Sequence, residues 1–271
     1  MSTAQKEFKN KNYLLIGAAN GLGKATACKL AESGAVLFLA DIDPKLNALC
    51  KILNKKTKCT SHVCDLLDYD KAADGLIRMM GKEAIDGVVY FTRGREKYSF
   101  AQLNKKKWQG DFRLSVESAM FIIHRLWTKK KIRKNASIVF LSSVCARLTG
   151  SESLAYHMAK SALESMCRYL AVEMGPANIR VNTLELGFLI KDEHKEKFYS
   201  KNNEKYRFWA ERMQPLRRVS HCEDIIGPIK FFLSQDSSFI TGQVLCVDGG
   251  STIQEQSKLV RDFVKAQKEN L

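Results

Sequence analysis

Tyr156 and Lys160 lie four residues apart in the stretch AYHMAK, at 155–160. Residues with this spacing are neighbours on one face of an α-helix. A phenol is a weak acid with an ordinary pKa of about 10, and a nearby ammonium stabilises its anion and lowers that pKa. The pair could therefore exchange a proton with a substrate oxygen, although the same spacing also occurs between side chains that merely share a helix face. The surrounding sequence has to decide between these interpretations.

A second group of residues has the composition of a phosphate-binding turn. An apolar run, YLLIG at 13–17, ends at Gly17. Gly21 and Gly23 then open a helical pattern that continues to residue 33. Glycines at this point allow a tight turn and let a pyrophosphate approach the backbone at a helix N-terminus. A strand, a glycine turn and a helix in this order predict a dinucleotide site, which also includes Asn20 and Leu22.

Asp41 ends the second apolar run, eighteen residues after Gly23. A carboxylate there can accept hydrogen bonds from the adenosine ribose and would repel a 2′-phosphate. No Lys or Arg lies inside the glycine turn before Gly21, where the residue is Asn20. We therefore expect NAD(H) rather than NADP(H). The alternative role for Asp41 is to cap the following helix, although Asp43 suits that role better.

These residues need a scaffold, and the chain alternates short apolar runs with amphipathic segments. Strands are expected at 13–17, 35–41, 59–65, 86–91, 136–142, 179–185 and 243–249, separated by helices near 21–33, 44–54, 68–81, up to 131, 153–174 and 222–234. Apolar strands separated by helices indicate a parallel sheet that is buried on both faces. We expect a single doubly wound α/β domain of the Rossmann type over 1–250, with about seven strands. The extension at 251–271 carries Leu259, Val260, Phe263 and Val264, which could form one face of a docking helix.

Composition narrows the class of protein. The net charge is +15, but the basic residues are spread along all 271 residues, so we do not expect nucleic acid as a partner. The densest basic run, KKKIRK at 129–134, is expected at a helix C-terminus, where cations are favourable. The eight cysteines show no metal-ligand spacing and predict reduced thiols in a cytoplasmic protein without a bound metal. No apolar run reaches membrane-spanning length, so no membrane partner is expected.

Five motifs in order give the sequence a family resemblance. They are GAANGLG at 17–23, CDL at 64–66, a serine (Ser143) thirteen residues before Tyr156, IRVN at 179–182 and ITGQVLCVDGG at 240–250. With these motifs the chain resembles the classical short-chain dehydrogenase/reductase family from about residue 10 to 250.

The resemblance implies a role for each matching residue. Tyr156 would be the general acid/base, Lys160 would assist it and hold the nicotinamide ribose, and Ser143 would orient the substrate oxygen. Ser142 is one residue too far from Tyr156 for that role. Further cofactor contacts are implied for Asp65, Leu66, Phe91, Arg93 and Gly187. For Arg93 the alternatives are a contact with the pyrophosphate, a contact with an anionic substrate, or an orientation toward solvent. The resemblance places the substrate lid at 188–218, a segment that is basic and aromatic in this sequence. Such a lid would suit an anionic substrate; equally, the segment could be an amphipathic helix whose charges are solvated.

The sequence departs from the family pattern at four places. The family's N-N-A-G after the fourth strand is YFTR at 90–93, with Gly94 displaced by one residue. Ser115 stands where the family has an asparagine that opens its helix for a proton relay. Leu186 replaces a proline, so the loop that follows is expected to be less constrained, and Ile16 replaces a threonine before the first glycine.

The sequence leaves three functions open. The first is an NAD(H)-dependent oxidoreductase that interconverts a secondary alcohol and a ketone, acting on a small molecule. The second is a nucleotide-binding protein of the same fold with impaired or non-redox activity and a regulatory or interaction role. The third is an acyl-carrier-protein-type ketoreductase, which Asp41 disfavours because NADP-selective members usually have a basic residue nearby. For each of these, the resemblance implies a homotetramer or a homodimer.

Overall fold

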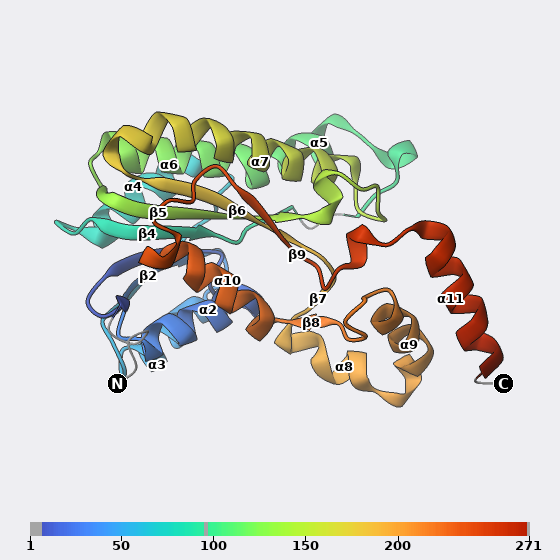
Figure 1. Cartoon of the computed structure of the whole chain (residues 1–271). Helices are drawn as coiled ribbons and strands as arrows, with labels where there is room; N and C mark the ends of the chain where they lie inside the picture. Colours follow the sequence, from blue (N-terminus) through green and yellow to red (C-terminus); the bar gives the residue numbers. More distant parts are fainter. Residues whose placement is uncertain (1–6, 95–96, 270–271) are drawn as a thin grey trace.

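The fold is built on one parallel sheet, seen in a computed structural model that describes residues 7–94 and 97–269 (Figure 1). Its seven strands follow the spatial order β3-β2-β1-β4-β5-β6-β9, and each neighbouring pair is parallel. The strands are β1 (Asn12–Ile16), β2 (Val36–Asp41), β3 (Cys59–Val63), β4 (Ile85–Tyr90), β5 (Ile132–Ser143), β6 (Arg180–Leu186) and β9 (Val244–Val247). The predicted doubly wound, seven-stranded architecture is confirmed.

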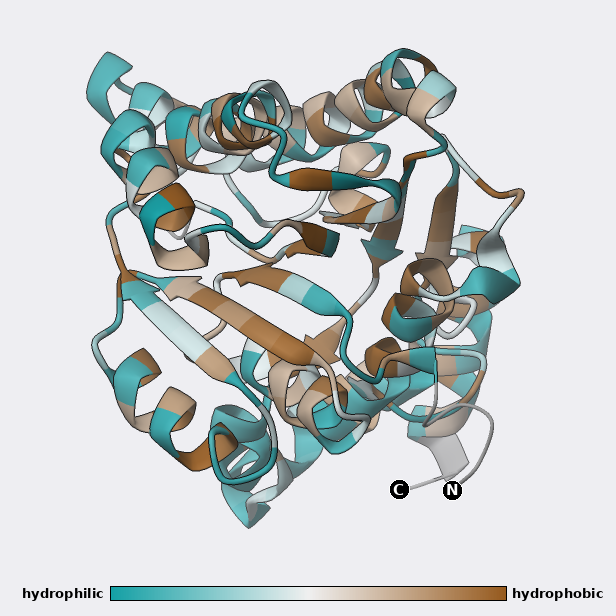
Figure 2. Ribbon diagram, turned by 90° about the vertical axis from the view of Figure 1, so that its left-hand side faces the viewer, coloured by the Kyte–Doolittle hydropathy of each residue, from teal (hydrophilic) through white to brown (hydrophobic). Residues whose placement is uncertain are grey.

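Helices cover both faces of the sheet because successive strand residues point to opposite sides. Leu15 of β1 belongs to a hydrophobic cluster with α2, α3 and α10, whereas its neighbour Leu14 belongs to a cluster with α4, α6 and α7. Figure 1 shows these two helix layers, and Figure 2 shows that hydrophobic residues concentrate in the strands between them. The helices are α2 (Gly21–Glu32), α3 (Lys45–Leu53), α10 (Cys222–Leu233), α4 (Tyr69–Met80), α6 (Ser118–Thr128) and α7 (Leu154–Met174).

The long helix expected up to residue 131 is interrupted. A first helix, α5 (Lys105–Phe112), joins α6 through a π-helical segment, Arg113–Glu117, which contains Ser115. A π-helical turn widens the helix and disturbs its regular hydrogen bonding.

The basic run at 129–134 also differs from the expectation of a helix C-terminus. Only its first residues follow α6, because β5 already begins at Ile132. In β5, Arg133 Nη1 lies 2.9 Å from Asp86 Oδ2. A carboxylate on the neighbouring strand therefore balances one charge that we had assigned to the helix terminus.

The segment 188–218 forms a small unit of its own beside the sheet. It contains α8 (Lys195–Tyr199) and α9 (Glu204–Arg212), and its first strand, β7 (Leu189–Ile190), pairs with β8 (Ser220–His221). Ile190, Phe198 and Ala210 of this segment form a hydrophobic centre together with Val219, the next residue after it. The aromatic residues of this lid therefore serve its own core at least in part: Phe198 is buried, and its ring centroid lies 6.2 Å from those of Phe188 and Tyr206.

The C-terminal extension forms helix α11 (Gln256–Glu269), which lies beside α9 (Figure 1). Phe263 packs against Trp209 with ring centroids 5.0 Å apart and an interplanar angle of 70°. Val260 and Val264, which we expected on the same docking face, are 60% and 48% exposed. No helix in the described part of the chain is long and apolar enough to cross a membrane.

Candidate functional site

The predicted site residues gather at the carboxyl edge of the sheet. The strand order places β1 beside β4, although β2 follows β1 in sequence, so the connections leave β1 and β4 in opposite directions. In open α/β sheets, ligands bind in the crevice outside such a switch point. The glycine turn follows β1, and the segment 91–94 follows β4, so both border this crevice.

The glycine turn has the conformation that its sequence requires. Gly17 adopts a φ of 89°. A Cβ on Gly23 would lie 2.1 Å from the Gly17 carbonyl oxygen, so the turn closes only because Gly23 has no side chain. Helix α2 begins here with no side-chain cap and no acidic residue in its first turn. A helix N-terminus without a side-chain cap favours an anion, which fits the pyrophosphate of a dinucleotide.

Asp41 lies at the end of β2 and holds the glycine turn. Its Oδ2 accepts a hydrogen bond from the Ala19 amide at 2.9 Å, and its Oδ1 accepts one from the Asp43 amide at 3.0 Å. The Asn20 side chain donates to Asp43 Oδ2 at 2.9 Å instead of capping α2. The carboxylate of Asp41 is therefore fixed beside the turn.

The next pair of predicted residues follows β3 and divides into two roles. Leu66 is buried in the hydrophobic core, whereas Asp65 is exposed and its Oδ1 accepts from the Leu67 amide at 2.9 Å. Only Asp65 therefore offers its side chain to a ligand. A hollow of about 460 Å³ adjoins this point, lined by Leu67, Lys105, Lys106, Gln109, Gly110 and Arg113.

The segment that replaces the family's N-N-A-G is held on both sides. The Phe91 amide donates to the Ile16 carbonyl at 2.8 Å, and the Thr92 methyl lies 3.0 Å from where a Cβ of Gly17 would be. On the other side, the Gly94 amide donates to Ser115 Oγ at 2.9 Å. Between these anchors, the Arg93 guanidinium lies over the Tyr156 ring, 5.4 Å from its centroid.

Tyr156, Lys160 and Ser143 come together at the start of α7 and the end of β5. Ser153 caps α7 by accepting from the Tyr156 amide at 3.3 Å, which fixes the start of the helix. Lys160 Nζ donates to the Leu141 carbonyl at 2.7 Å and lies 5.5 Å from the Tyr156 ring centroid. The two side chains therefore lie close together where α7 meets the end of β5.

The two adjacent serines have different surroundings. Ser142 Oγ donates to Glu164 Oε1 at 2.7 Å on the α7 side of the sheet, so its hydroxyl is already engaged. Ser143 Oγ accepts from the Cys145 amide at 3.3 Å and interacts with the Tyr156 hydroxyl. This arrangement agrees with the preference for Ser143 that the spacing indicates.

Burial dominates the proton affinities of the two ionisable groups. It lowers the pKa of Lys160 to about 7, and the charge of Arg93 acts in the same direction. It raises the pKa of Tyr156, while the Ser143 hydrogen bond and the charge of Arg93 oppose that change. The lowered Tyr156 pKa that the sequence predicts is therefore not found in this structure. The physical reason is that a largely buried phenolate loses more solvation than the neighbouring charges restore.

The loop after β6 is paired more closely than we expected. Leu186 lies opposite Val247 of β9, and the Gly187 amide donates to the Val247 carbonyl at 3.2 Å. A Cβ on Gly187 would lie 2.7 Å from Asp248 Cβ, so a glycine is needed here. With leucine in place of the proline, the chain stays paired with β9 as far as Gly187.

The structure adds two site residues that sequence reasoning missed. Glu152 Oε2 lies 4.0 Å from Arg93 Nη1, at the edge of the Tyr156 site. Lys191 follows β7, and its Cδ lies 2.9 Å from where a Cβ of Gly21 would be, so the lid begins against the glycine turn. Neither residue belongs to a motif, but Lys191 lies in the expected lid at 188–218 and Glu152 lies three residues before AYHMAK.

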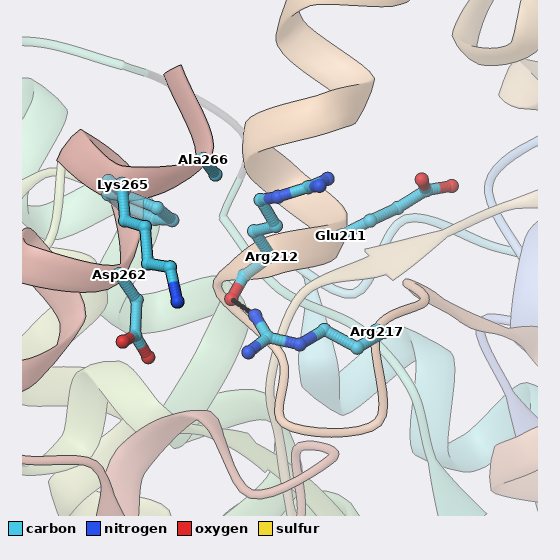
Figure 3. A pocket seen from close by; sticks show the side chains of 7 residues that line it. Glu211, Arg212, Arg217, Asp262, Lys265 and Ala266 are labelled. Carbon is cyan, nitrogen blue, oxygen red and sulfur yellow. Dashed lines mark hydrogen bonds between the residues drawn. The ribbon is translucent and has the colours of Figure 1, made fainter. Parts of the chain in front are cut away.

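A separate cavity of about 440 Å³ lies between α9 and α11 (Figure 3). In it, Arg217 Nη1 donates to the Arg212 carbonyl at 2.9 Å, while Asp262 and Lys265 project from α11. The full lining is Glu211, Arg212, Arg217, Asp262, Phe263, Lys265 and Ala266. None of these residues belongs to the glycine turn or to the Tyr156 site, so the cavity is distinct from the candidate site.

Comparisons with known proteins match nearly the whole chain. Residues 17–252 match the family model described as enoyl-(acyl carrier protein) reductase. The chain is 29% identical over 262 residues to an L-rhamnose 1-dehydrogenase (NADP(+)) of Thermoplasma acidophilum, covering 92% of this chain and 99% of that protein. It is 27% identical over 249 residues to a 3-oxoacyl-[acyl-carrier-protein] reductase of Thermotoga maritima, covering 91% and 99%.

A solved structure agrees with these sequence matches. A short-chain type dehydrogenase/reductase from Mycobacterium ulcerans is 26% identical and superposes with a TM-score of 0.78, covering 92% of each chain. The ordered motifs, the sheet topology and the match over residues 17–252 all point to the same family. The chain is a member of the classical short-chain dehydrogenase/reductase family of oxidoreductases, which bind nicotinamide cofactors.

Proposed function

We propose that this protein is an NAD(H)-dependent oxidoreductase that interconverts a secondary alcohol and a ketone, with Tyr156 as general acid/base. The observation that carries the proposal is the convergence of Ser143, Tyr156 and Lys160 beside the crevice that the glycine turn borders. A phenol, a hydroxyl and a buried amine at one point suit proton exchange with a carbonyl oxygen.

The preference for NAD(H) rests on Asp41. Its carboxylate is held beside the glycine turn by two backbone amides, where it would bind the ribose hydroxyls and repel a 2′-phosphate. The relative from Thermoplasma acidophilum is named as NADP(+)-dependent. Because the two coenzymes differ at that phosphate alone, a direct comparison of their affinities decides the point.

The bound nicotinamide would supply the hydride donor or acceptor. Residues of the chain would then stabilise the charge that develops on the substrate oxygen and exchange a proton with it. Ser143 Oγ would donate a hydrogen bond to that oxygen, and the Tyr156 hydroxyl would give it a proton in reduction or take one in oxidation. Lys160 lies 5.5 Å from the Tyr156 ring and would place positive charge near the phenolate whenever it is protonated.

Because the pKa of Tyr156 is raised, its phenolate depends on nearby positive charges for stabilisation. A phenolate at neutral pH needs positive charge nearby, and Lys160 is only partly protonated there because burial lowers its pKa to about 7. The positive charge of Arg93 opposes the rise of the Tyr156 pKa. In this chain Arg93 would therefore share the supporting role that the family pattern gives to the lysine.

Two measurements test the proposed function. Thermal unfolding with NADH and with NADPH is expected to show a higher Tm with at least one nucleotide; if neither changes the Tm, the cofactor assignment is wrong. Oxidation of a panel of secondary alcohols with NAD⁺ is then expected to fall by about 10²–10⁴-fold in Tyr156→Phe. Tyr169→Phe, an exposed tyrosine on the same helix, is the matched control. Turnover that survives in Tyr156→Phe contradicts the mechanism.

One observation favours a second candidate, a nucleotide-binding protein of this fold without redox activity. The Ser115 hydroxyl, at the position of the family's relay asparagine, already accepts from the Gly94 amide. A protein with this second function would bind nucleotide but would turn over neither alcohols nor ketones. Nucleotide binding without turnover across a wide substrate panel distinguishes this protein from the proposed oxidoreductase.

We further propose self-association through the outer faces of α6 and α7. Both helices leave large apolar residues exposed to solvent, including Met120, Phe121, Met158, Tyr169 and Val172. Large apolar residues that are exposed in this way are expected to form part of a protein interface. A dimer or tetramer by light scattering that dissociates in Val172→Glu would support this assembly, and a wild-type monomer would contradict it.

A cytoplasmic location is supported by the cysteines. All eight lie in described segments, and each is a free thiol. Free cysteines are typical of a reducing compartment.

A further inference from the structure

Arg93 is the least expected residue of the candidate site. The Arg93 side chain leaves a backbone held by Thr92 against Gly17 and by Gly94 against Ser115. Gly94 cannot be replaced without a shift, because a Cβ there would lie 2.3 Å from the buried Asp111 carboxylate. The backbone on both sides of Arg93 is therefore fixed, which directs its side chain toward Tyr156.

The partner of Arg93 is only weakly engaged. Glu152 Oε2 lies 4.0 Å from Arg93 Nη1, at the limit of an ion pair, whereas Glu152 Oε1 lies 3.1 Å from Lys97 Nζ. No other carboxylate pairs with Arg93 within the described ranges. A guanidinium has five N–H donors in a planar fork that matches a carboxylate, and Glu152 engages only one end of it among the residues that the structure describes.

Two basic side chains lie close to the Tyr156 ring. Arg93 and Lys160 both lie within 6 Å of the Tyr156 ring centroid, at 5.4 and 5.5 Å. The carboxylate at this rim, Glu152, is shared with Lys97. An anionic ligand group would be attracted to this positive charge, and the Arg93 side chain is 36% exposed and so accessible to it.

We propose that Arg93 binds a carboxylate of the substrate, carried on a carbon next to the reacting carbon or one further away. The preferred substrates would thus be hydroxy acids and their oxo acids. Glu152 would hold the guanidinium until the substrate carboxylate replaces it. This inference deepens the proposed function and rests on it for the identity of the reacting carbon.

Calorimetric titration with three matched pairs of ligands tests the proposal. The pairs are lactate with lactamide, 3-hydroxybutyrate with its methyl ester, and glycerol 3-phosphate with glycerol. Each pair keeps a secondary alcohol and removes the charge. Wild-type protein saturated with NADH is expected to prefer at least one of the two carboxylates over its neutral partner by about tenfold or more, because hydrogen bonds between charged groups are strong.

Variants assign that preference to a residue. Arg93→Gln should abolish it, and Arg93→Lys should keep only part, because lysine retains the charge without the fork. Lys129→Gln removes an exposed charge at the opposite edge of the sheet and should leave the preference within about twofold. Glu152→Gln removes the competing carboxylate and should strengthen it.

Several results would overturn the proposal. These are no preference for either carboxylate in the wild type, a preference for the phosphate alone, or a carboxylate preference that survives in Arg93→Gln. If Arg93 only tethered Glu152, Arg93→Gln and Glu152→Gln would lower the Tm alike and leave the ratio of charged to neutral binding unchanged. The same titrations without nucleotide separate this inference from the proposed function, because an anion preference can persist where NADH fails to bind or Tyr156→Phe stays active.

Discussion

The amide of Gly94 donates a hydrogen bond to Ser115 Oγ at 2.9 Å. This bond joins the segment after β4 to the π-helical turn between α5 and α6. It explains how the chain accommodates two of its departures together. The displaced glycine brings a backbone N–H to the helix, and the short serine side chain leaves room to accept it. Arg93 owes its place over Tyr156 in part to this contact.

Ser115→Ala is expected to lower the free energy of unfolding by about 1–3 kcal/mol, because the buried Gly94 amide loses its acceptor. Chemical denaturation measures the change. Ser165→Ala, at an exposed position on α7, is the control and should change stability by less than about 0.5 kcal/mol. Equal losses in the two variants would show that the bond contributes little.

Asp41→Asn should reduce the preference for NADH over NADPH by about tenfold, equivalent to about 1.4 kcal/mol. The substitution removes the charge that repels a 2′-phosphate and keeps an oxygen for the Ala19 amide. Fluorescence titration gives both dissociation constants. Asp65→Ala is the control: its position after β3 implies an effect on both nucleotides alike, so their ratio should not change. If Asp41→Asn leaves the ratio unchanged, Asp41 does not select the coenzyme.

The buried Lys160 should give stability a distinctive pH dependence. Burial lowers its pKa to about 7 in the folded protein, against about 10.4 in the unfolded chain. Between these values the unfolded state binds more protons, so this group makes stability rise with pH from about 7 to 10, by up to about 1.4 kcal/mol per pH unit. Below pH 7 it is protonated in both states and adds no slope.

Lys160→Met should remove that slope, while Lys97→Met, at an exposed position, should keep it. Denaturation midpoints at pH 6, 7, 8 and 9 measure the effect. A wild-type curve with the same slope as Lys160→Met would mean that Lys160 remains charged in the folded protein.

Gly23→Ala should disrupt the glycine turn, because the new methyl would lie 2.1 Å from the Gly17 carbonyl. We expect a lower Tm and loss of NADH binding. Gly227→Ala is the matched control, since a Cβ there meets nothing within 4 Å in helix α10. Alanine in a helix is more favourable than glycine by about 0.5–1 kcal/mol, so this control should be neutral or stabilising. A Gly23→Ala protein that binds NADH normally would contradict the assigned turn.

The sequence by itself determined the scaffold. The doubly wound sheet follows from strands that are apolar on both sides, such as VLFLAD of β2, separated by amphipathic helices. The glycine turn and Asp41 could be predicted because their chemistry depends on backbone shape and spacing along one strand-turn-helix unit. The relationship of Tyr156 to Lys160 was accessible for the same reason, since both lie on one helix.

Only the tertiary structure decided what depends on contacts between distant segments. The rise of the Tyr156 pKa comes from burial, which no local pattern records. The bond from Gly94 to Ser115 and the place of Lys191 against Gly21 join segments far apart in the chain. Arg93 is the clearest case. Its sequence position allowed a contact with pyrophosphate, with substrate or with solvent, and the folded chain places it over the Tyr156 ring because both of its neighbours are anchored.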